Sequence, residues 1–379
     1  GEQVRVNVQL LDARNVAHVW AESFDRKLTD MFAVESEVAE KIANTLQARL
    51  TGEEQQALAV TPTRSDAAYD AYLRGLAYER LAAVAPEIFE TAIGFYNEAV
   101  RLDPQFAVAW AHLAMVQSAM YHFGFDHTPM RLEAMKRAAE TAMKLQPNLG
   151  ESLLAWGFYQ YRGTQDYFAA DKAFDDARQR LPNDAWTVEC GSFVKRRQGK
   201  WDQAIALLEK VMQLDPRNAQ LHSELRYTIS QAEGDLDGAD RALASQPLQP
   251  GNPTVFTTQM TQLLFRRNFG QAISALSAAL QFPDNSLGGQ LGEYYVILSL
   301  AQHASGDEAG ARATCEQGIA YLDQIRATNA DTWFVSACFG LLRAGLGDEA
   351  GAMREGEHSF ALTAPMCPRA RMSKKQSRA

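Results

Sequence analysis

The residues best suited to binding a ligand are arginines that recur in two neighbouring stretches of the chain. Arg162 follows Tyr161, and Arg196 is next to Arg197. A guanidinium pairs in a two-pronged way with a carboxylate, and an adjacent tyrosine adds a flat apolar contact. We therefore predict that these four residues contact an extended acidic segment of a partner or of the parent chain. The alternative is a solvated charged helix surface.

A second polar group lies in the aromatic-rich stretch from 121 to 129, which contains His122, Asp126 and His127. Imidazole and carboxylate groups are zinc ligands. Two close histidines without a helical or cysteine partner are nevertheless a weak metal motif. We expect a surface loop anchored by its aromatic side chains, with neither a metal ion nor another cofactor. The four cysteines are scattered without a C-x-x-C pair, which favours neither a zinc site nor a disulfide framework.

Catalytic signatures are absent from the sequence. It has no G-x-S-x-G elbow, no G-x-x-x-x-G-K-[ST] phosphate loop, no G-x-G-x-x-G and no H-E-x-x-H. The net charge of −9 disfavours binding to nucleic acid or to an anionic membrane surface. No apolar run is long enough to span a bilayer, so we expect no membrane insertion by this chain. These features predict a non-catalytic chain of ordinary globular composition.

The elements that position the arginines follow a fixed period. The stretch from Trp201 to Pro216 has the apolar spacing of an amphipathic helix, which the proline ends. Pro182, Pro216 and Pro250 are spaced by 34 residues. Four of the expected helices end with the same pattern. A small residue is followed four positions later by a bulky residue and, in three of the four helices, by an alanine three positions after that. The sets are Ala92, Tyr96 and Ala99; Ala170, Phe174 and Ala177; Ala204, Leu208 and Val211; and Ala272, Leu276 and Ala279.

This pattern resembles the tetratricopeptide repeat (TPR) family, whose helix–turn–helix unit has this length. The resemblance implies an all-α fold, a right-handed superhelix of about eight repeats over residues 67–365. It places Arg162, Arg196 and Arg197 late in the first helices of two adjacent repeats, where TPR units line their concave groove. The expected partner is a protein or peptide in that groove. We interpret residues 366–379 as a basic, disordered tail.

Residues 1–60 have a different pattern. Val4, Val6, Val8 and Leu10 alternate with polar residues, and a returning strand and a helix from about 32 to 50 follow. The run GEQVRVNVQLLDARNVAHVWAESFDRKLTDMFAVESEVAEKIANTL resembles the end of a small, TolB N-terminal-like α/β domain that precedes TPR arrays in bacterial signalling proteins. We expect a truncated α/β domain at 1–60 and a linker at 61–66.

The combined resemblance implies a protein-binding, regulatory region of a bacterial signalling protein. Parents of this kind commonly carry a class III adenylate cyclase domain or a winged-helix DNA-binding domain. The chain is therefore alternatively the regulatory half of a cyclase or of a transcriptional regulator. A homo-oligomeric scaffold without a groove ligand is a further alternative. The expected location is cytoplasmic, or periplasmic if the parent carries an upstream transmembrane helix.

Overall fold

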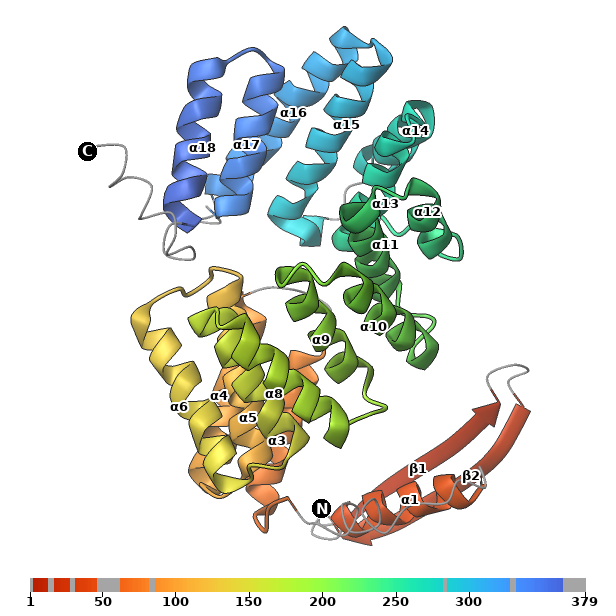
Figure 1. The fold of residues 1–379 in the computed structure, drawn as a ribbon, viewed down its shortest axis with the longest axis vertical. Coiled ribbons are helices and arrows are strands. Elements are labelled where there is room, and N and C mark those ends of the chain that lie inside the picture. The colour runs from red at the N-terminus through yellow and green to blue at the C-terminus, as the bar shows by residue number, and fades with distance from the viewer. Residues whose placement is uncertain are drawn as a thin grey trace. The chain divides into compact units, whose positions relative to one another are not determined.

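The structure, a computed structural model, describes residues 3–12, 17–27, 31–45, 62–81, 86–281, 285–327 and 332–363 (Figure 1). In chain order the elements are β1 (Gln3–Asp12), β2 (Ala17–Lys27), α1 (Met31–Thr45), α3 (Asp66–Glu79), α4 (Pro86–Leu102), α5 (Ala107–His122), α6 (Pro129–Leu145), α7 (Gly150–Phe158), the π-helix η2 (Tyr159–Thr164), α8 (Tyr167–Arg180), α9 (Ala185–Arg197), α10 (Trp201–Leu214), α11 (Ala219–Glu233), α12 (Leu236–Leu243), α13 (Pro253–Phe265), α14 (Phe269–Gln281), the 3-10 helix η3 (Asn285–Gln290), α15 (Leu291–Ser305), α16 (Glu308–Ala327), α17 (Trp333–Gly345) and α18 (Glu349–Thr363).

Apart from one hairpin, the described ranges are helical, which confirms the predicted helical array after a short α/β segment. Contacts divide the chain into two units, residues 1–117 with 137–155 and residues 118–136 with 156–379. The predicted tail at 366–379 lies outside the described residues. None of the described helices combines the length and the apolar character needed to cross a membrane.

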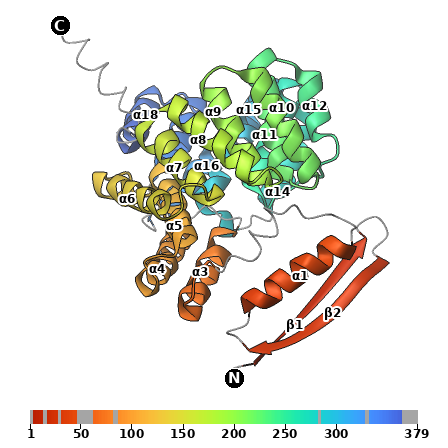
Figure 2. The same ribbon diagram turned by 60° about the horizontal axis from the view of Figure 1, so that its bottom comes forward.

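The hairpin at the start of the first unit is antiparallel, with Val6 opposite Phe24. Helix α1 lies along it, as Figure 2 shows. Phe24 and Val34 are buried at this contact, because the alternating strand pattern turns every second side chain towards the helix. Across the strands, Arg5 Nε lies 2.6 Å from an oxygen of Asp25 in an exposed pair.

Helices α3 and α4 show how the small and bulky positions of the repeat are used. Ala92, Tyr96 and Ala99 are fully buried. The Tyr96 ring fills the space beside Gly75, where an added Cβ would lie 2.7 Å from ring atom Cε1. The Tyr96 hydroxyl donates to Glu79, whose carboxylate also lies 2.8 Å from Nδ1 of His112. The buried polar groups of this repeat therefore have partners, as stable interiors require.

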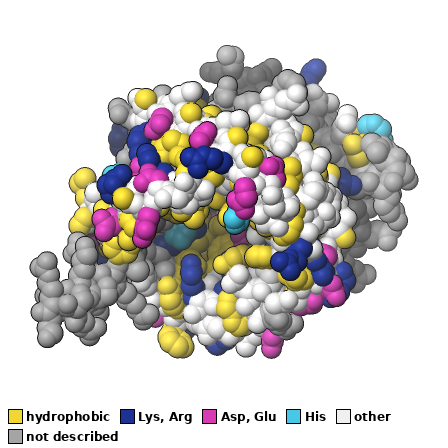
Figure 3. Space-filling view, turned by 90° about the horizontal axis from the view of Figure 1, so that it is seen from above, with side chains coloured by type: hydrophobic (Ala, Val, Ile, Leu, Met, Phe, Trp, Pro, Cys, Tyr) yellow, Lys and Arg dark blue, Asp and Glu magenta, His cyan; other side chains and the backbone are white. Residues whose placement is uncertain are grey.

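The second unit repeats this packing. Ala170, Phe174 and Ala177 are buried, and so are the matching residues of α10, Ala204, Leu208 and Val211. The fourth set is looser, because Ala279 is only half-buried. Charges of both signs are interspersed with apolar side chains on the face shown in Figure 3.

Candidate functional site: an arginine-lined pocket

A polar pocket of about 180 Å³ lies within the second unit. Its lining, here called the arginine pocket, consists of Tyr121, His122, His127, Tyr161, Arg162, Gln165, Tyr167 and Arg197. These residues come from the end of α5 and the loop after it, from η2 and the start of α8, and from the end of α9. The pocket is therefore built where the first helices of three successive helical pairs end.

The backbone at the pocket is unusual. Helix α7 widens into the π-helix η2, which carries Tyr161 and Arg162. Gln165 follows in the left-handed conformation with φ of 59°. Short π-helical segments and left-handed residues other than glycine are uncommon and concentrate at functional sites. Asp166 then caps α8, because its side chain accepts hydrogen bonds from the backbone amides of Phe168 and Ala169.

Arg162 lies deep in the pocket. Its guanidinium carbon is 4.5 Å from the centre of the Phe158 ring, and Nη1 donates to the Ser118 hydroxyl at 3.1 Å. Its Nε is buried and has no hydrogen-bond partner among the described residues. Burial lowers the pKa of Arg162 to about 10, so the group remains charged at neutral pH. A buried N–H donor without an acceptor is costly to the fold.

Arg197 stands at the exposed side of the same pocket. Its Nε lies 3.4 Å from the Tyr161 hydroxyl, which raises the pKa of Arg197. Because this hydroxyl accepts from Arg197, its own proton remains available to a ligand. Neither Arg162 nor Arg197 forms an ion pair with a carboxylate in the described part of the chain. Two positive charges thus share one pocket without a compensating negative charge.

The two histidines of the pocket respond to this charge. His127 donates from Nδ1 to the Tyr121 carbonyl at 2.9 Å, and its ring stacks on Tyr121 with 3.6 Å between ring centres. The pKa of His122 is lowered to about 3, first by burial and then by Arg162, Arg197 and His127. His122 is therefore neutral at physiological pH.

Asp126, which the sequence placed in one cluster with these histidines, has other partners. Its carboxylate accepts from Arg131 Nε at 2.8 Å and from the Thr128 hydroxyl at 2.7 Å. Within the ranges that the structure describes, no group of three histidine, cysteine, aspartate or glutamate side chains is placed to hold a metal ion. The stretch is an aromatic-anchored loop that contributes His127 to the arginine pocket.

Arg196 differs from the other three residues of the predicted binding set. Tyr161, Arg162 and Arg197 line the pocket, whereas Arg196 points to α11. Its Nη1 lies 2.8 Å from Glu224 and 3.3 Å from the Thr228 hydroxyl. Successive helical residues point about 100° apart, so adjacent arginines face different surroundings. A partner-binding role for all four remains a prediction.

Three lining residues were not selected from the sequence. They are Tyr121, Gln165 and Tyr167. The aromatic-rich loop was a visible signal for Tyr121, but nothing in the sequence marks Gln165 as left-handed.

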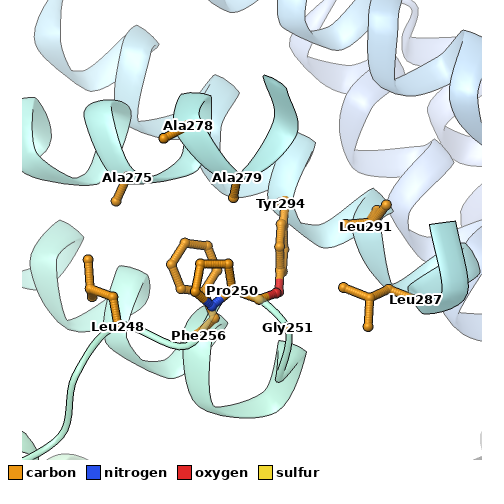
Figure 4. Close-up of a pocket in the computed structure, with 10 residues that line it drawn as sticks. All are labelled: Leu248, Pro250, Gly251, Phe256, Ala275, Ala278, Ala279, Leu287, Leu291 and Tyr294. Carbon is orange, nitrogen blue, oxygen red and sulfur yellow. The ribbon is translucent and has the colours of Figure 1, made fainter. Parts of the chain in front are cut away.

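A second, apolar pocket of about 410 Å³ also lies in the second unit (Figure 4). Alanines of α14 line one side, and Phe256, Pro250 and Tyr294 lie opposite them. The Tyr294 hydroxyl donates to the Pro250 carbonyl at 2.7 Å. Ala279 of the fourth repeat set lines this pocket, and its described lining carries no charged side chain, so it offers less specificity than the arginine pocket.

Comparison with known proteins agrees with the helical pairs. A family model for the tetratricopeptide repeat matches residues 195–257. This segment therefore matches a tetratricopeptide repeat (TPR), and the helical array has the fold of a TPR solenoid. The chain is also similar to a human IFIT1 dimer structure determined with m7Gppp-AAAA. The identity is 14% over 88% of this chain and 78% of that chain, with a TM-score of 0.51. Its similarity to yeast Tom70 is 17% identity over 83% and 66%, again with a TM-score of 0.51. At such identities the likeness concerns the fold alone.

Part of the chain also matches a protein by sequence. The protein named "Putative adenylate cyclase 3" from Rhizobium meliloti (strain 1021) is 30% identical over 118 residues. The matched segment is 30% of this chain and 19% of that protein. The relative is thus much longer than the region it shares with this chain.

Proposed function

We propose that this TPR array is a non-catalytic, protein-binding regulatory region of a bacterial signalling protein. A TPR fold supports interaction with proteins, because stacked helix pairs present an extended surface to a ligand. In this proposal residues 1–60 form the end of a separate α/β domain and residues 67–365 form the interaction domain. The expected location is cytoplasmic.

The ligand of the array is, in this proposal, an acidic segment that places an anionic group in the arginine pocket. The observation that carries it is the pair of guanidiniums, Arg162 and Arg197, without a carboxylate partner in the described residues. The chain has a net charge of −9, and Arg196, by contrast, forms an ion pair with Glu224. Arg162 also keeps a buried N–H without an acceptor. An incoming anion supplies the compensating charge.

A more specific candidate is the regulatory half of an adenylate cyclase. The similarity to the Rhizobium meliloti protein supports this parent over a winged-helix regulator. In a full-length parent, the acidic segment could belong to the same polypeptide, and cyclase activity should then change when Arg197 is reversed in charge.

Binding of an acidic peptide tests the proposal. The probe is a fluorescein-labelled peptide of alternating glutamate and alanine, and its glutamine counterpart is the negative control. Wild type should bind the glutamate peptide better than the glutamine peptide, and the difference should shrink as salt rises. Arg197→Glu should abolish the difference, because it reverses an exposed charge of the pocket.

Arg312→Glu is a matched control, since Arg312 is an exposed arginine on α16 and does not line the pocket. It should bind like the wild type. Equal binding of both peptides by the wild type would contradict the acidic-segment proposal. The proposal would also be contradicted if Arg197→Glu and Arg312→Glu lost binding to the same extent. Light scattering on the same samples distinguishes a homo-oligomeric scaffold, which would associate in the absence of any peptide.

A further inference from the structure

The arginine pocket presents its hydrogen-bond donors from two directions. Arg162 lies on η2, while Arg197 reaches the pocket from the end of α9. Tyr161 lies between them, accepts from Arg197 and keeps its hydroxyl proton for a ligand. One guanidinium fork is enough for a planar carboxylate. Two guanidiniums and a hydroxyl instead suit a group with three terminal oxygens.

The charge of the pocket also favours a group with three terminal oxygens over a carboxylate. Its lining contains two arginines and no carboxylate. A carboxylate would neutralise one of the two charges. A phosphoryl group carries about −1.5 to −2 charges at pH 7 and three strong acceptor oxygens, so it neutralises both.

The histidines also fit such a group. His127 uses Nδ1 to donate to the Tyr121 carbonyl, so its neutral form carries no proton on Nε2. Nε2 can therefore accept a hydrogen bond from a protonated phosphoryl oxygen, which an ionised carboxylate cannot donate. The volume of about 180 Å³ is below the range of about 300–1,000 Å³ typical of pockets that enclose a whole small molecule. It suits a head group on a longer ligand.

We propose that the arginine pocket binds a phosphoryl group, held by Arg162, Arg197 and the hydroxyl of Tyr161. The inference rests on the proposed function, because it names the anionic group that the partner segment places in the pocket. The same chemistry is offered by free inorganic phosphate and by a phosphorylated side chain, and the two sources are separated by experiment.

The test uses the whole chain in a buffer free of phosphate, with sodium chloride balancing the ionic strength. Isothermal titration calorimetry measures binding of inorganic phosphate, of a phosphoserine peptide and of the same peptide with glutamate in place of phosphoserine. Inorganic phosphate and the phosphoserine peptide should both bind. The phosphoserine peptide should bind at least about tenfold more tightly than the glutamate peptide. Tighter binding of the peptide than of inorganic phosphate identifies a phosphorylated segment as the source, and the reverse identifies the free ion.

The variants are Arg197→Gln, Arg162→Gln and the control Arg312→Gln. Arg197→Gln keeps the fold, because Arg197 is exposed, and should weaken phosphate binding at least about tenfold. Ring proton shifts of His122 and His127, followed by nuclear magnetic resonance, should move on phosphate addition in the wild type and in Arg312→Gln, but not in Arg197→Gln.

Unchanged phosphate affinity in Arg197→Gln would overturn the inference. Binding of the glutamate peptide as tightly as the phosphoserine peptide would also overturn it, while leaving the acidic-segment function intact. If the wild type binds no anionic peptide, both the phosphoryl inference and the acidic-segment function are contradicted.

Discussion

Arg196 and Arg197 are adjacent in the chain, yet among the residues that the structure describes only Arg196 has an acidic partner. Arg196 Nη1 lies 2.8 Å from Glu224, and its guanidinium carbon lies 5.5 Å from the ring centres of Phe193 and Tyr227. Arg197 lies 3.4 Å from the Tyr161 hydroxyl. The first arginine joins α9 to α11, and the second remains available to a ligand. Arg196 should therefore contribute mainly to stability, and Arg197 mainly to binding.

The first prediction concerns this division. Arg196→Gln should lower the free energy of unfolding by about 1–3 kcal/mol, because it removes hydrogen bonds to a charged group and leaves Glu224 largely buried without its cation. Arg197→Gln should change it by less than about 0.5 kcal/mol, as expected for an exposed side chain. Urea unfolding followed by circular dichroism measures both. Equal destabilisation by the two variants would show that the arginines share one environment.

How far the sequence predicts this molecule depends on whether a feature is local. The burial of Ala92, Tyr96 and Ala99 follows from helical periodicity, and the structure confirms it. The environment of Arg196 does not follow, because it depends on how α11 turns Glu224 towards α9. The arginines of the pocket were recognised by type and spacing.

The rest of the pocket depends on contacts between distant stretches. His122 was grouped in the sequence with Asp126, but stacking of the helical pairs brings it to Arg162 and Arg197. The left-handed backbone of Gln165 has no sequence signal, since that conformation is rare for residues other than glycine. Such features arise from tertiary packing and not from local propensity.

The second prediction tests the repeat register. Ala204 is fully buried where α10 meets its neighbours, whereas Ala206 on the same helix is exposed. Ala204→Leu should overpack this contact and cost about 1–3 kcal/mol. Ala206→Leu introduces the same side chain at a solvent-facing position and should be close to neutral. Thermal melting of the two variants decides the matter, and similar melting curves would contradict the register.

The third prediction concerns pH. Burial, with a smaller contribution from Glu224, raises the pKa of Glu189 from 4.5 to about 8 against the opposing effect of Arg196. The folded state therefore holds a protonated acid while the unfolded state ionises above about pH 4.5. The stabilisation linked to this proton is fully present below pH 4.5 and is lost as pH rises to about 8.

Glu189→Gln should remove this loss, so its urea midpoint should fall less between pH 5 and pH 8 than that of the wild type. Glu209→Gln, at an exposed position on α10, is the control and should follow the wild type. If wild type and Glu189→Gln show the same pH dependence, Glu189 ionises normally in the fold.

The last prediction uses His122 as a sensor of the arginine pocket. Its pKa of about 3 results first from burial and then from the positive charges of Arg162 and Arg197. Arg197→Gln removes one of these charges without filling the pocket, so the pKa of His122 should rise while remaining below its usual value of 6.5, because burial persists. Nuclear magnetic resonance of histidine-labelled protein between pH 3 and pH 8 measures the change. Arg312→Gln removes an exposed charge that is not among the causes of the His122 shift and should leave the titration unchanged. If His122 titrates near 6.5 in the wild type, the imidazole is solvated and the pocket lacks the uncompensated positive charge on which its anion binding depends.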